Sequence, residues 1–206
     1  MERIQLLEDW VKEQFPAMPF TMQAASVDAS FRRYFRISFA DQTFIVMDAP
    51  PQHEDCKPFL RVAEILAATG VHVPKILAQN LEQGFLLLSD LGNTTFLQAL
   101  NDQRDIANHI YGDAMDALIK MQVSQRAEGL PDYDEVLLLR ELNLFPDWYI
   151  AKHLQKDLSE EQQVVLHTVF TRILQKNLAQ PKVLVHRDYH SRNLMVTSPN
   201  SGIIDF

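Results

Sequence analysis

The sequence predicts an α+β protein built from two lobes, because the residue pattern changes part-way along the chain. Residues 1–91 contain mainly short segments rich in β-branched and aromatic residues, as is typical of strands. Residues 92–206 carry mostly the longer apolar periodicity of helices and end in short apolar segments separated by polar loops. Strands followed by helices indicate an α+β fold rather than alternating βα units. We therefore expect an N-terminal lobe over residues 1–91, a helical C-terminal lobe over residues 92–206, and a crevice between them.

The first lobe is predicted to combine a sheet with two helices. Ile4, Leu7 and Val11 recur at helical spacing in a segment that Pro16 ends. The dipeptide at 41–42 is short enough to join the strands on either side of it as a hairpin. The expected elements are helices over residues 3–15 and 58–69 and strands over residues 20–25, 31–39, 43–48 and 84–89.

The second lobe is predicted to be mostly helical. Ser159 is followed three residues later by Gln162, the signature of a capping box at a helix start. The expected helices cover residues 94–100, 104–125, 134–153 and 159–179, and the expected short strands cover residues 183–185, 194–196 and 203–204.

The composition excludes several classes of protein. A chain of 206 residues that is 47% hydrophobic and 22% charged is suited to a folded core rather than to disorder. Its formal net charge of −8 argues against nucleic-acid or anionic-membrane partners, since both need a basic face. Cys56 is the only cysteine, which excludes an internal disulfide and a cysteine-rich zinc module. No apolar run approaches the roughly 20 residues of a membrane span, and the N-terminus lacks the pattern of a signal peptide. A cytoplasmic protein is therefore expected.

Residues 183–206 hold the group of side chains with the clearest chemistry. Two apolar segments bracket a loop that contains His186, Asp188, His190 and Asn193, and a further apolar segment delivers Asp205. Transfer of a phosphoryl group from a nucleotide needs one carboxylate to take the proton of the acceptor hydroxyl, and oxygen ligands for Mg²⁺. The pattern predicts Asp188 as the catalytic base and Asn193 with Asp205 as the metal ligands.

Two other interpretations of these residues stay open at this point. Each of the acidic and amide residues taken singly is also typical of a turn or a helix cap. His186, Asp188 and His190 alternate along the chain, so on an extended segment they would share one face, as zinc ligands often do. No other ligand type lies near them with suitable spacing, which disfavours zinc. His186 itself is better explained as a residue that packs and holds the loop.

The order His186-Arg187-Asp188, then Asn193, then the Ile204-Asp205-Phe206 segment, resembles the catalytic core of the aminoglycoside phosphotransferase family. That family is similar in fold to the eukaryotic protein kinases, so the resemblance implies a bilobal, protein-kinase-like fold. The segments 30–37, 47–51, 87–92 and 141–150 resemble those of bacterial cell-wall sugar kinases. These enzymes phosphorylate the anomeric hydroxyl of N-acetylmuramate and N-acetylglucosamine during peptidoglycan recycling.

The resemblance implies a set of binding residues and cofactors. It implies ATP or GTP as the phosphoryl donor, Mg²⁺ as the cofactor, and a small sugar as the acceptor. The nucleotide base is expected at a hinge that includes Leu88, Ser89 and Asp90, although Asp90 is also suited to capping the next helix. Glu141, Trp148 and His190 are the candidate acceptor-binding residues. No oligomeric state is predicted.

The sequence also departs from the family pattern. The third strand usually carries a lysine for the nucleotide phosphates, but here the residues at that place are Met47 and Asp48. The segment 26–30, where the phosphate loop is expected, has no glycine. Arg32, Arg33 and Arg36 are candidates to supply the missing positive charge, since a guanidinium binds phosphate bidentately.

Three further expectations follow from the resemblance. Glu64 lies on the helix whose glutamate would pair with the missing lysine, so it is equally well explained as a solvated residue. Family members continue well past the Ile204-Asp205-Phe206 segment, so we expect a truncated C-terminal lobe and an incomplete acceptor site. An aminoglycoside-modifying kinase and a catalytically inactive nucleotide-binding module are the alternative functions.

Overall fold

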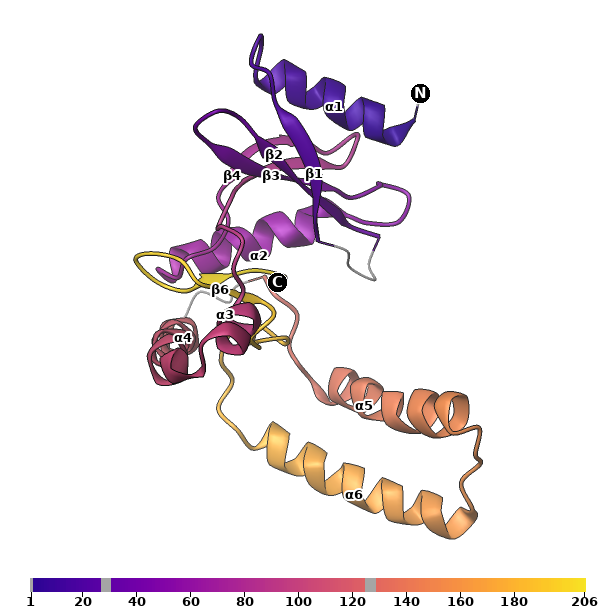
Figure 1. Cartoon of the computed structure of the whole chain (residues 1–206). Helices are drawn as coiled ribbons and strands as arrows, with labels where there is room; N and C mark the ends of the chain where they lie inside the picture. The colour runs from indigo at the N-terminus through magenta and orange to yellow at the C-terminus, as the bar shows by residue number, and fades with distance from the viewer. Residues whose placement is uncertain (1, 27–30, 125–128) are drawn as a thin grey trace. The chain divides into compact units, whose positions relative to one another are not determined.

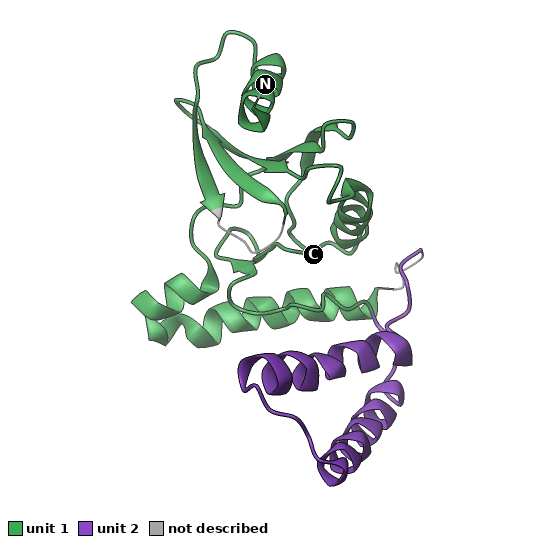
Figure 2. Ribbon diagram, turned by 90° about the vertical axis from the view of Figure 1, so that its right-hand side faces the viewer, with its two compact units in different colours: residues 1–126, 184–206 green, residues 127–183 purple. Residues whose placement is uncertain are grey.

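The computed structural model describes residues 2–26, 31–124 and 129–206 of the chain (Figure 1). The chain divides into two compact units (Figure 2). Unit 1 contains Met1–Arg126 together with Leu184–Phe206, and unit 2 contains Ala127–Val183. Within the described residues, no helix combines the length and the apolar character that a membrane crossing requires.

A five-stranded antiparallel sheet forms the first part of unit 1. Its strands lie in the order β1-β2-β3-β5-β4, so β5 is inserted between β3 and the edge strand β4. The β2–β3 hairpin pairs Arg33 with Asp48 at one end and Ser38 with Thr43 at the other, as the sequence predicted. The elements of this part are α1 (Arg3–Gln14), β1 (Thr21–Ser26), β2 (Arg33–Ser38), β3 (Thr43–Asp48), α2 (Cys56–Ala68), β4 (Ile76–Asn80) and β5 (Phe85–Ser89).

The two faces of the sheet have separate cores, because side chains alternate between faces along each strand. Leu7, Trp10 and Val11 of α1 pack against one face together with Ile37, Val46, Phe85 and Leu87. Met47, Leu86 and Leu88 face the other way and pack with Cys56 and Phe59 of α2. This second face also contacts Phe206 at the end of the chain, so it is the face that the functional residues approach.

An ion cluster around a buried carboxylate lies on the α1 face of the sheet. The carboxylate of Asp48 is fully buried and accepts hydrogen bonds from the guanidinium groups of Arg3, at 2.7 Å, and Arg33, at 3.0 Å. Arg3 also donates to the carbonyl of Gln83 at 2.6 Å. Two arginines compensate the cost of burying one carboxylate, and they join α1 to the sheet.

The rest of unit 1 supports the loop that carries Asp188. Thr95 begins α3 with a full capping box that Gln98 completes. The Tyr189 hydroxyl donates to the carbonyl of Ala114 in α4 at 2.7 Å, and burial raises the pKa of Tyr189 to about 12. The remaining elements are α3 (Phe96–Asp102), the 3₁₀ turn η1 (Arg104–Ile106), α4 (Ala107–Val123), β6 (Leu194–Met195) and β7 (Gly202–Ile203).

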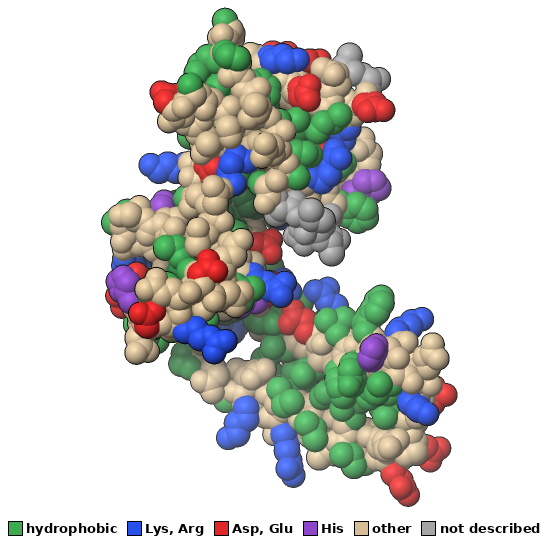
Figure 3. Space-filling model, viewed as in Figure 1, with side chains coloured by type: hydrophobic (Ala, Val, Ile, Leu, Met, Phe, Trp, Pro, Cys, Tyr) green, Lys and Arg blue, Asp and Glu red, His purple; other side chains and the backbone are tan. Residues whose placement is uncertain are grey.

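Unit 2 consists of α5 (Glu135–Leu144), a π-helical segment η2 (Phe145–His153) and α6 (Glu160–Leu178). Asp134 caps α5, and Ser159 caps α6 through the capping box that the sequence predicted. Many large apolar side chains of this unit are exposed, and they gather on the face in Figure 3. Examples are Val136 at 76%, Trp148 at 64% and Val164 at 66% exposure.

Two expected elements differ from the structure, and one strand of the structure was not expected. The helix expected over 134–153 changes to π-helical geometry after Leu144, since Pro146 has no N–H to continue the α-helical ladder. The strand expected over 183–185 does not form, because only Leu184 of its three residues is buried. Strand β4 was not predicted. Its half-buried residues Ile76, Ala78 and Asn80 alternate with exposed ones, but Gln79 and Asn80 are polar, so the segment lacks the apolar pattern that is typical of a strand.

Candidate active site

The loop from His186 to Asn193 is fixed from two sides. The amide of Leu97 in α3 donates to the carbonyl of Ser191 at 2.9 Å, and Tyr189 anchors the loop to α4. Inside the loop, the amide of Asn193 donates to the carbonyl of His190 at 2.9 Å. These bonds hold in place a segment that has no regular secondary structure.

Asp188, Asn193 and Asp205 lie together, as the sequence predicted. The side-chain nitrogen of Asn193 donates to Oδ2 of Asp188 at 2.9 Å and to the Asp188 carbonyl at 3.1 Å. The same nitrogen lies 3.4 Å from Oδ2 of Asp205. Asn193 is buried, whereas the two carboxylates are exposed to solvent. One amide thus joins two carboxylates that are 17 residues apart in the sequence.

His190 holds the other oxygen of Asp188. The amide of Arg192 donates to Nδ1 of His190 at 3.2 Å, so the neutral ring carries its proton on Nε2. That nitrogen lies 3.0 Å from Oδ1 of Asp188 and donates to it. Both carboxylate oxygens of Asp188 therefore have a hydrogen-bond donor, which fixes the orientation of the carboxylate.

His186 supports the loop from inside. Its Nε2 donates to the carbonyl of Ile204 at 3.2 Å, and the amide of Asp188 donates to its Nδ1 at 3.4 Å. Burial lowers the pKa of His186, so the ring is neutral at pH 7. One ring nitrogen bonds within the loop and the other bonds Ile204 after β7, in agreement with the expectation that His186 is structural.

Asp205 follows the short strand β7, which pairs with β6 and brings Ile203 opposite Leu194. The amide of Ile204 donates to the carbonyl of Asn193 at 3.0 Å. Asp205 adopts a left-handed backbone with φ of 60°, which a non-glycine residue rarely does. The next residue, Phe206, stacks on Phe59 of α2 with ring centroids 5.1 Å apart. This turn directs the Asp205 carboxylate toward Asn193 and the phenyl ring toward α2.

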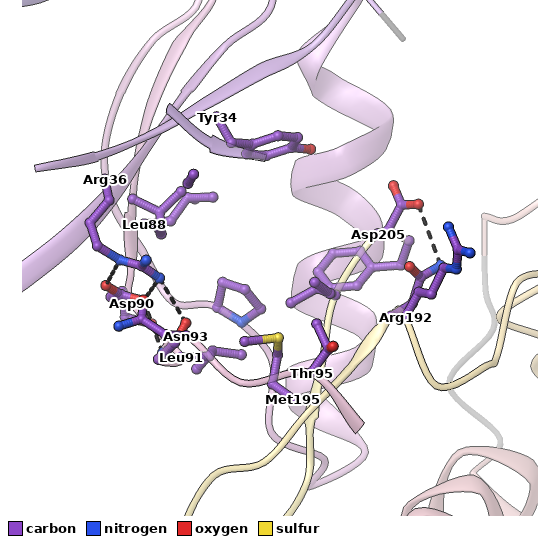
Figure 4. Close-up of a pocket in the computed structure, with 18 of the residues that line it drawn as sticks. Tyr34, Arg36, Leu88, Asp90, Leu91, Asn93, Thr95, Arg192, Met195 and Asp205 are labelled. Atoms are coloured by element: carbon purple, nitrogen blue, oxygen red, sulfur yellow. Dashed lines mark hydrogen bonds and ion pairs between the residues drawn. The ribbon is translucent and has the colours of Figure 1, made fainter. Parts of the chain in front are cut away.

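A pocket of about 400 Å³ lies against these residues within unit 1 (Figure 4). Asn193, Asp205 and Phe206 line it, as do the predicted nucleotide-binding residues Leu88, Ser89 and Asp90. The size suits a small molecule. The sequence did not point to several further lining residues: Tyr34, Ile45, Asn93, Thr95, Gln98, Arg192 and Met195.

The segment after β5 is fixed by a single arginine of β2. Arg36 donates through Nε to Asp90 Oδ2 at 2.6 Å and through Nη2 to Asp90 Oδ1 at 3.0 Å. The same Nη2 donates to the carbonyl of Gly92 at 2.7 Å, and the Gly92 amide donates to Asp90 at 2.9 Å. Burial alone would raise the pKa of Asp90, but the hydrogen bonds from Arg36, Thr43 and Gly92 outweigh it and lower that pKa. The Asp90 side chain is 4% exposed and is occupied by these partners.

The three candidate arginines occupy different places. Arg36 lines the pocket but is held by Asp90. Arg33 binds Asp48 and lies on the α1 face of the sheet, so the structure does not bring it to the pocket. Arg32 lies 3.4 Å from Glu54 and its guanidinium lies 5.8 Å from the centre of the Phe59 ring, beside the pocket wall. Residues 27–30 of the expected phosphate loop fall outside the described residues.

Three other predicted residues lie elsewhere. Glu64 is on the exposed side of α2, 3.3 Å from Arg61. Glu141 and Trp148 belong to unit 2, where Glu141 accepts a hydrogen bond from the Tyr133 hydroxyl. Trp148 is largely exposed. The structure therefore does not connect Glu141 or Trp148 with the pocket of unit 1.

The donor set at Asn193 and Asp205 fits Mg²⁺, which prefers carboxylate and carbonyl oxygens. An amide has both a donor and an acceptor, so Asn193 can hold Asp188 with its nitrogen and offer its oxygen to a metal. The zinc alternative has no counterpart within residues 2–26, 31–124 and 129–206, where no group of three His, Cys, Asp or Glu side chains could hold a metal.

A comparison with known protein families shows to which family this chain belongs. The phosphotransferase enzyme family matches residues 21–206, which include the whole sheet and the site. The chain belongs to the phosphotransferase enzyme family. The resemblance carried by His186, Asp188, Asn193 and Asp205 is thereby confirmed.

Relatives in this family align with nearly the whole of this chain. A protein of Pseudomonas aeruginosa named N-acetylmuramate/N-acetylglucosamine kinase is 48% identical over 214 residues, and one of Neisseria meningitidis with the same name is 40% identical over 209 residues. The matches cover 99% and 100% of this chain but 63% and 62% of the two relatives. The chain thus spans less than two thirds of the length of the curated relatives it matches.

Solved structures of phosphotransferases share the fold. An aminoglycoside phosphotransferase solved with streptomycin and ATP has a TM-score of 0.59 at 14% identity, covering 97% of this chain and 69% of that protein. A choline/ethanolamine kinase family protein of Mesorhizobium loti has a TM-score of 0.63 at 14% identity, covering 99% of this chain and 64% of that protein. At such identity the likeness concerns the fold alone, and it confirms the expected kinase-like α+β fold.

Proposed function

We propose that the protein transfers the terminal phosphoryl group of ATP or GTP to a hydroxyl of an amino sugar. The main support is the grouping of Asp188, Asn193 and Asp205 through one amide, beside a pocket of nucleotide size. Membership of the phosphotransferase family and the names of the relatives support the same reaction class.

Asp188 is proposed as the base of the reaction. Its two oxygens are oriented by His190 and Asn193, and it is exposed enough to meet an acceptor. As the acceptor oxygen forms a bond to the terminal phosphorus, its proton passes to Asp188 and the bond to the nucleoside diphosphate breaks. Asn193 and Asp205 would hold Mg²⁺, which neutralises charge on the phosphates when bound.

The nucleotide is proposed to occupy the pocket with its base along the segment after β5. Leu88 and Ile45 give this end an apolar wall on the sheet face opposite α1. The backbone at Ser89, Asp90 and Leu91 lines the same end and offers hydrogen-bonding groups to a purine.

The acceptor is proposed to be N-acetylmuramate or N-acetylglucosamine, phosphorylated on the anomeric hydroxyl. The names of the relatives support this choice over an aminoglycoside. Glu141 and Trp148 remain proposed acceptor-binding residues, since an acid and an aromatic face both suit a sugar. We place the reaction in the cytoplasm, as the absence of disulfide-forming cysteine pairs agrees with a reducing compartment.

A substrate panel tests this function. The full-length protein is incubated with Mg²⁺, ATP or GTP, and one of N-acetylmuramate, N-acetylglucosamine, kanamycin or no acceptor, while nucleoside diphosphate release is measured. We expect release that depends on either N-acetyl sugar. Release with kanamycin alone would favour the aminoglycoside alternative, and nucleotide binding without any release would favour an inactive binding module.

A further inference from the structure

Arg192 lies in the loop that carries the proposed catalytic residues, and it lines the pocket. It directly precedes the proposed metal ligand Asn193, and its side chain lines the pocket and is exposed. Figure 4 shows Arg192 beside Asp205, while Arg36 lies with Asp90 at the other end of the pocket. Arg192 therefore lies where the reacting groups of a bound nucleotide and acceptor would meet.

The guanidinium of Arg192 is not engaged by the protein. Its backbone amide binds His190, but across residues 2–26, 31–124 and 129–206 its side chain makes no hydrogen bond or ion pair. The other pocket-lining cation of this part of the chain, Arg36, makes three hydrogen bonds to Asp90 and Gly92. The two arginines thus differ. Arg36 stabilises the segment after β5 through its hydrogen bonds, whereas the N–H donors of the Arg192 guanidinium can bind a ligand.

The geometry of the arginine side chain indicates which kind of ligand it would bind. A guanidinium presents parallel N–H donors that match the two oxygens of a carboxylate or a phosphate. β3 has Met47 and Asp48 in the region where the family pattern places a phosphate-binding lysine, and Arg33 is bound to Asp48 on the α1 face of the sheet. We infer that Arg192 is an oxyanion-binding residue of this active site and supplies positive charge that β3 lacks.

Two groups could supply the oxyanion that Arg192 binds. In both cases the inference rests on the proposed function. One is the terminal phosphate of the nucleotide next to Asn193 and Asp205. The other is the carboxylate of the acceptor, since N-acetylmuramate carries a lactyl carboxylate that N-acetylglucosamine lacks. The shared chemistry is a bidentate contact between a guanidinium and two oxygens.

The test compares Arg192→Met and Arg192→Lys with the wild-type full-length protein and with Arg104→Met, a control arginine that is exposed and outside the pocket lining. For each protein, kcat and KM are measured with both sugars, and the Kd values of Mg·ATP and adenosine are measured by calorimetry. Loss of a charged hydrogen-bond partner predicts an effect of about tenfold or more. Arg192→Lys should retain part of the function, because it keeps the charge but loses the fork.

The pattern of effects distinguishes the two sources. If Arg192 contacts phosphate, Arg192→Met lowers kcat/KM for both sugars alike, and it weakens the binding of Mg·ATP but not the binding of adenosine. If Arg192 contacts the acceptor, Arg192→Met raises KM for N-acetylmuramate and leaves KM for N-acetylglucosamine unchanged. The inference is overturned if Arg192→Met matches Arg104→Met in all these measurements. If the wild type phosphorylates neither sugar, the proposed function fails, and the Mg·ATP arm alone then decides whether Arg192 binds phosphate.

Discussion

Asn193 is the residue on which the geometry of the site depends. Its nitrogen joins the carboxylates of Asp188 and Asp205, and its backbone carbonyl accepts the amide of Ile204. Its burial keeps the amide in one orientation, while the two carboxylates stay accessible. The sequence supplied these three residues because their spacing is short and their chemistry is specific. The contribution of His190 to the orientation of Asp188 depends on loop geometry that spacing alone does not give.

At the same scale, His186 predicts how stability depends on pH. Its pKa in the folded protein is lowered by burial, so below its ordinary value of 6.5 the unfolded chain binds more protons than the folded one. The free energy of unfolding should therefore fall as the pH falls below 6.5, with a slope from this group of at most about 1.4 kcal/mol per pH unit.

Urea unfolding between pH 8 and pH 5 measures this dependence. His186→Gln should have a shallower pH slope than the wild type, whereas the exposed control His109→Gln should keep the wild-type slope. Equal slopes for His186→Gln and the wild type would show that His186 is not the neutral buried group described above.

At the scale of elements, the hinge after β5 is fixed by a contact that crosses the sheet. Arg36 and Asp90 are 54 residues apart, and they meet because β2 and β5 flank the same strand, β3. Periodicity predicted most strands and helices, since it reports which face of an element is buried. It could not predict that Asp90 would bind an arginine rather than cap a helix, because that depends on the pairing order of strands. The π-helical segment η2 was missed for a related reason: Pro146 ends the α-helical ladder without ending the helix.

A double-mutant cycle on Arg36 and Asp90 tests the hinge. Arg36→Met and Asp90→Asn should each weaken nucleotide binding, because either change releases the segment that lines the end of the pocket where the base is proposed to bind. Their coupling free energy, from unfolding of the single and double variants, should fall within about 0.5–3 kcal/mol for contacting residues.

The exposed pair Lys12 and Asp9 is a matched control, and its coupling should be much smaller since both side chains face solvent. Additive effects of Arg36→Met and Asp90→Asn on both stability and nucleotide affinity would contradict a brace between them.

At the scale of the whole molecule, the chain is acidic, whereas the proposed nucleotide ligand is a polyanion. A net charge of −8 does not favour the approach of a nucleotide. The proposed metal at Asn193 and Asp205, together with Arg192 beside them, would supply local positive charge for such a ligand. The sequence predicted the family and the catalytic core, yet the choice among its arginines required the structure. Arg33 and Arg36 are three residues apart on one strand and point to opposite faces of the sheet.

The proposed mechanism divides the two carboxylates: Asp188 serves the acceptor, and Asp205 serves the metal and the nucleotide. The most direct measurement compares Asp188→Asn and Asp205→Asn in the full-length protein, by sugar-dependent ADP release and by the Kd of ATP with and without Mg²⁺. Asp188→Asn should lower kcat by roughly 10²–10⁴-fold and leave the Mg·ATP affinity nearly unchanged. Asp205→Asn should remove most of the gain in ATP affinity that Mg²⁺ provides. Wild-type turnover in Asp188→Asn, or an unchanged Mg²⁺ effect in Asp205→Asn, would show that the two carboxylates do not have these roles.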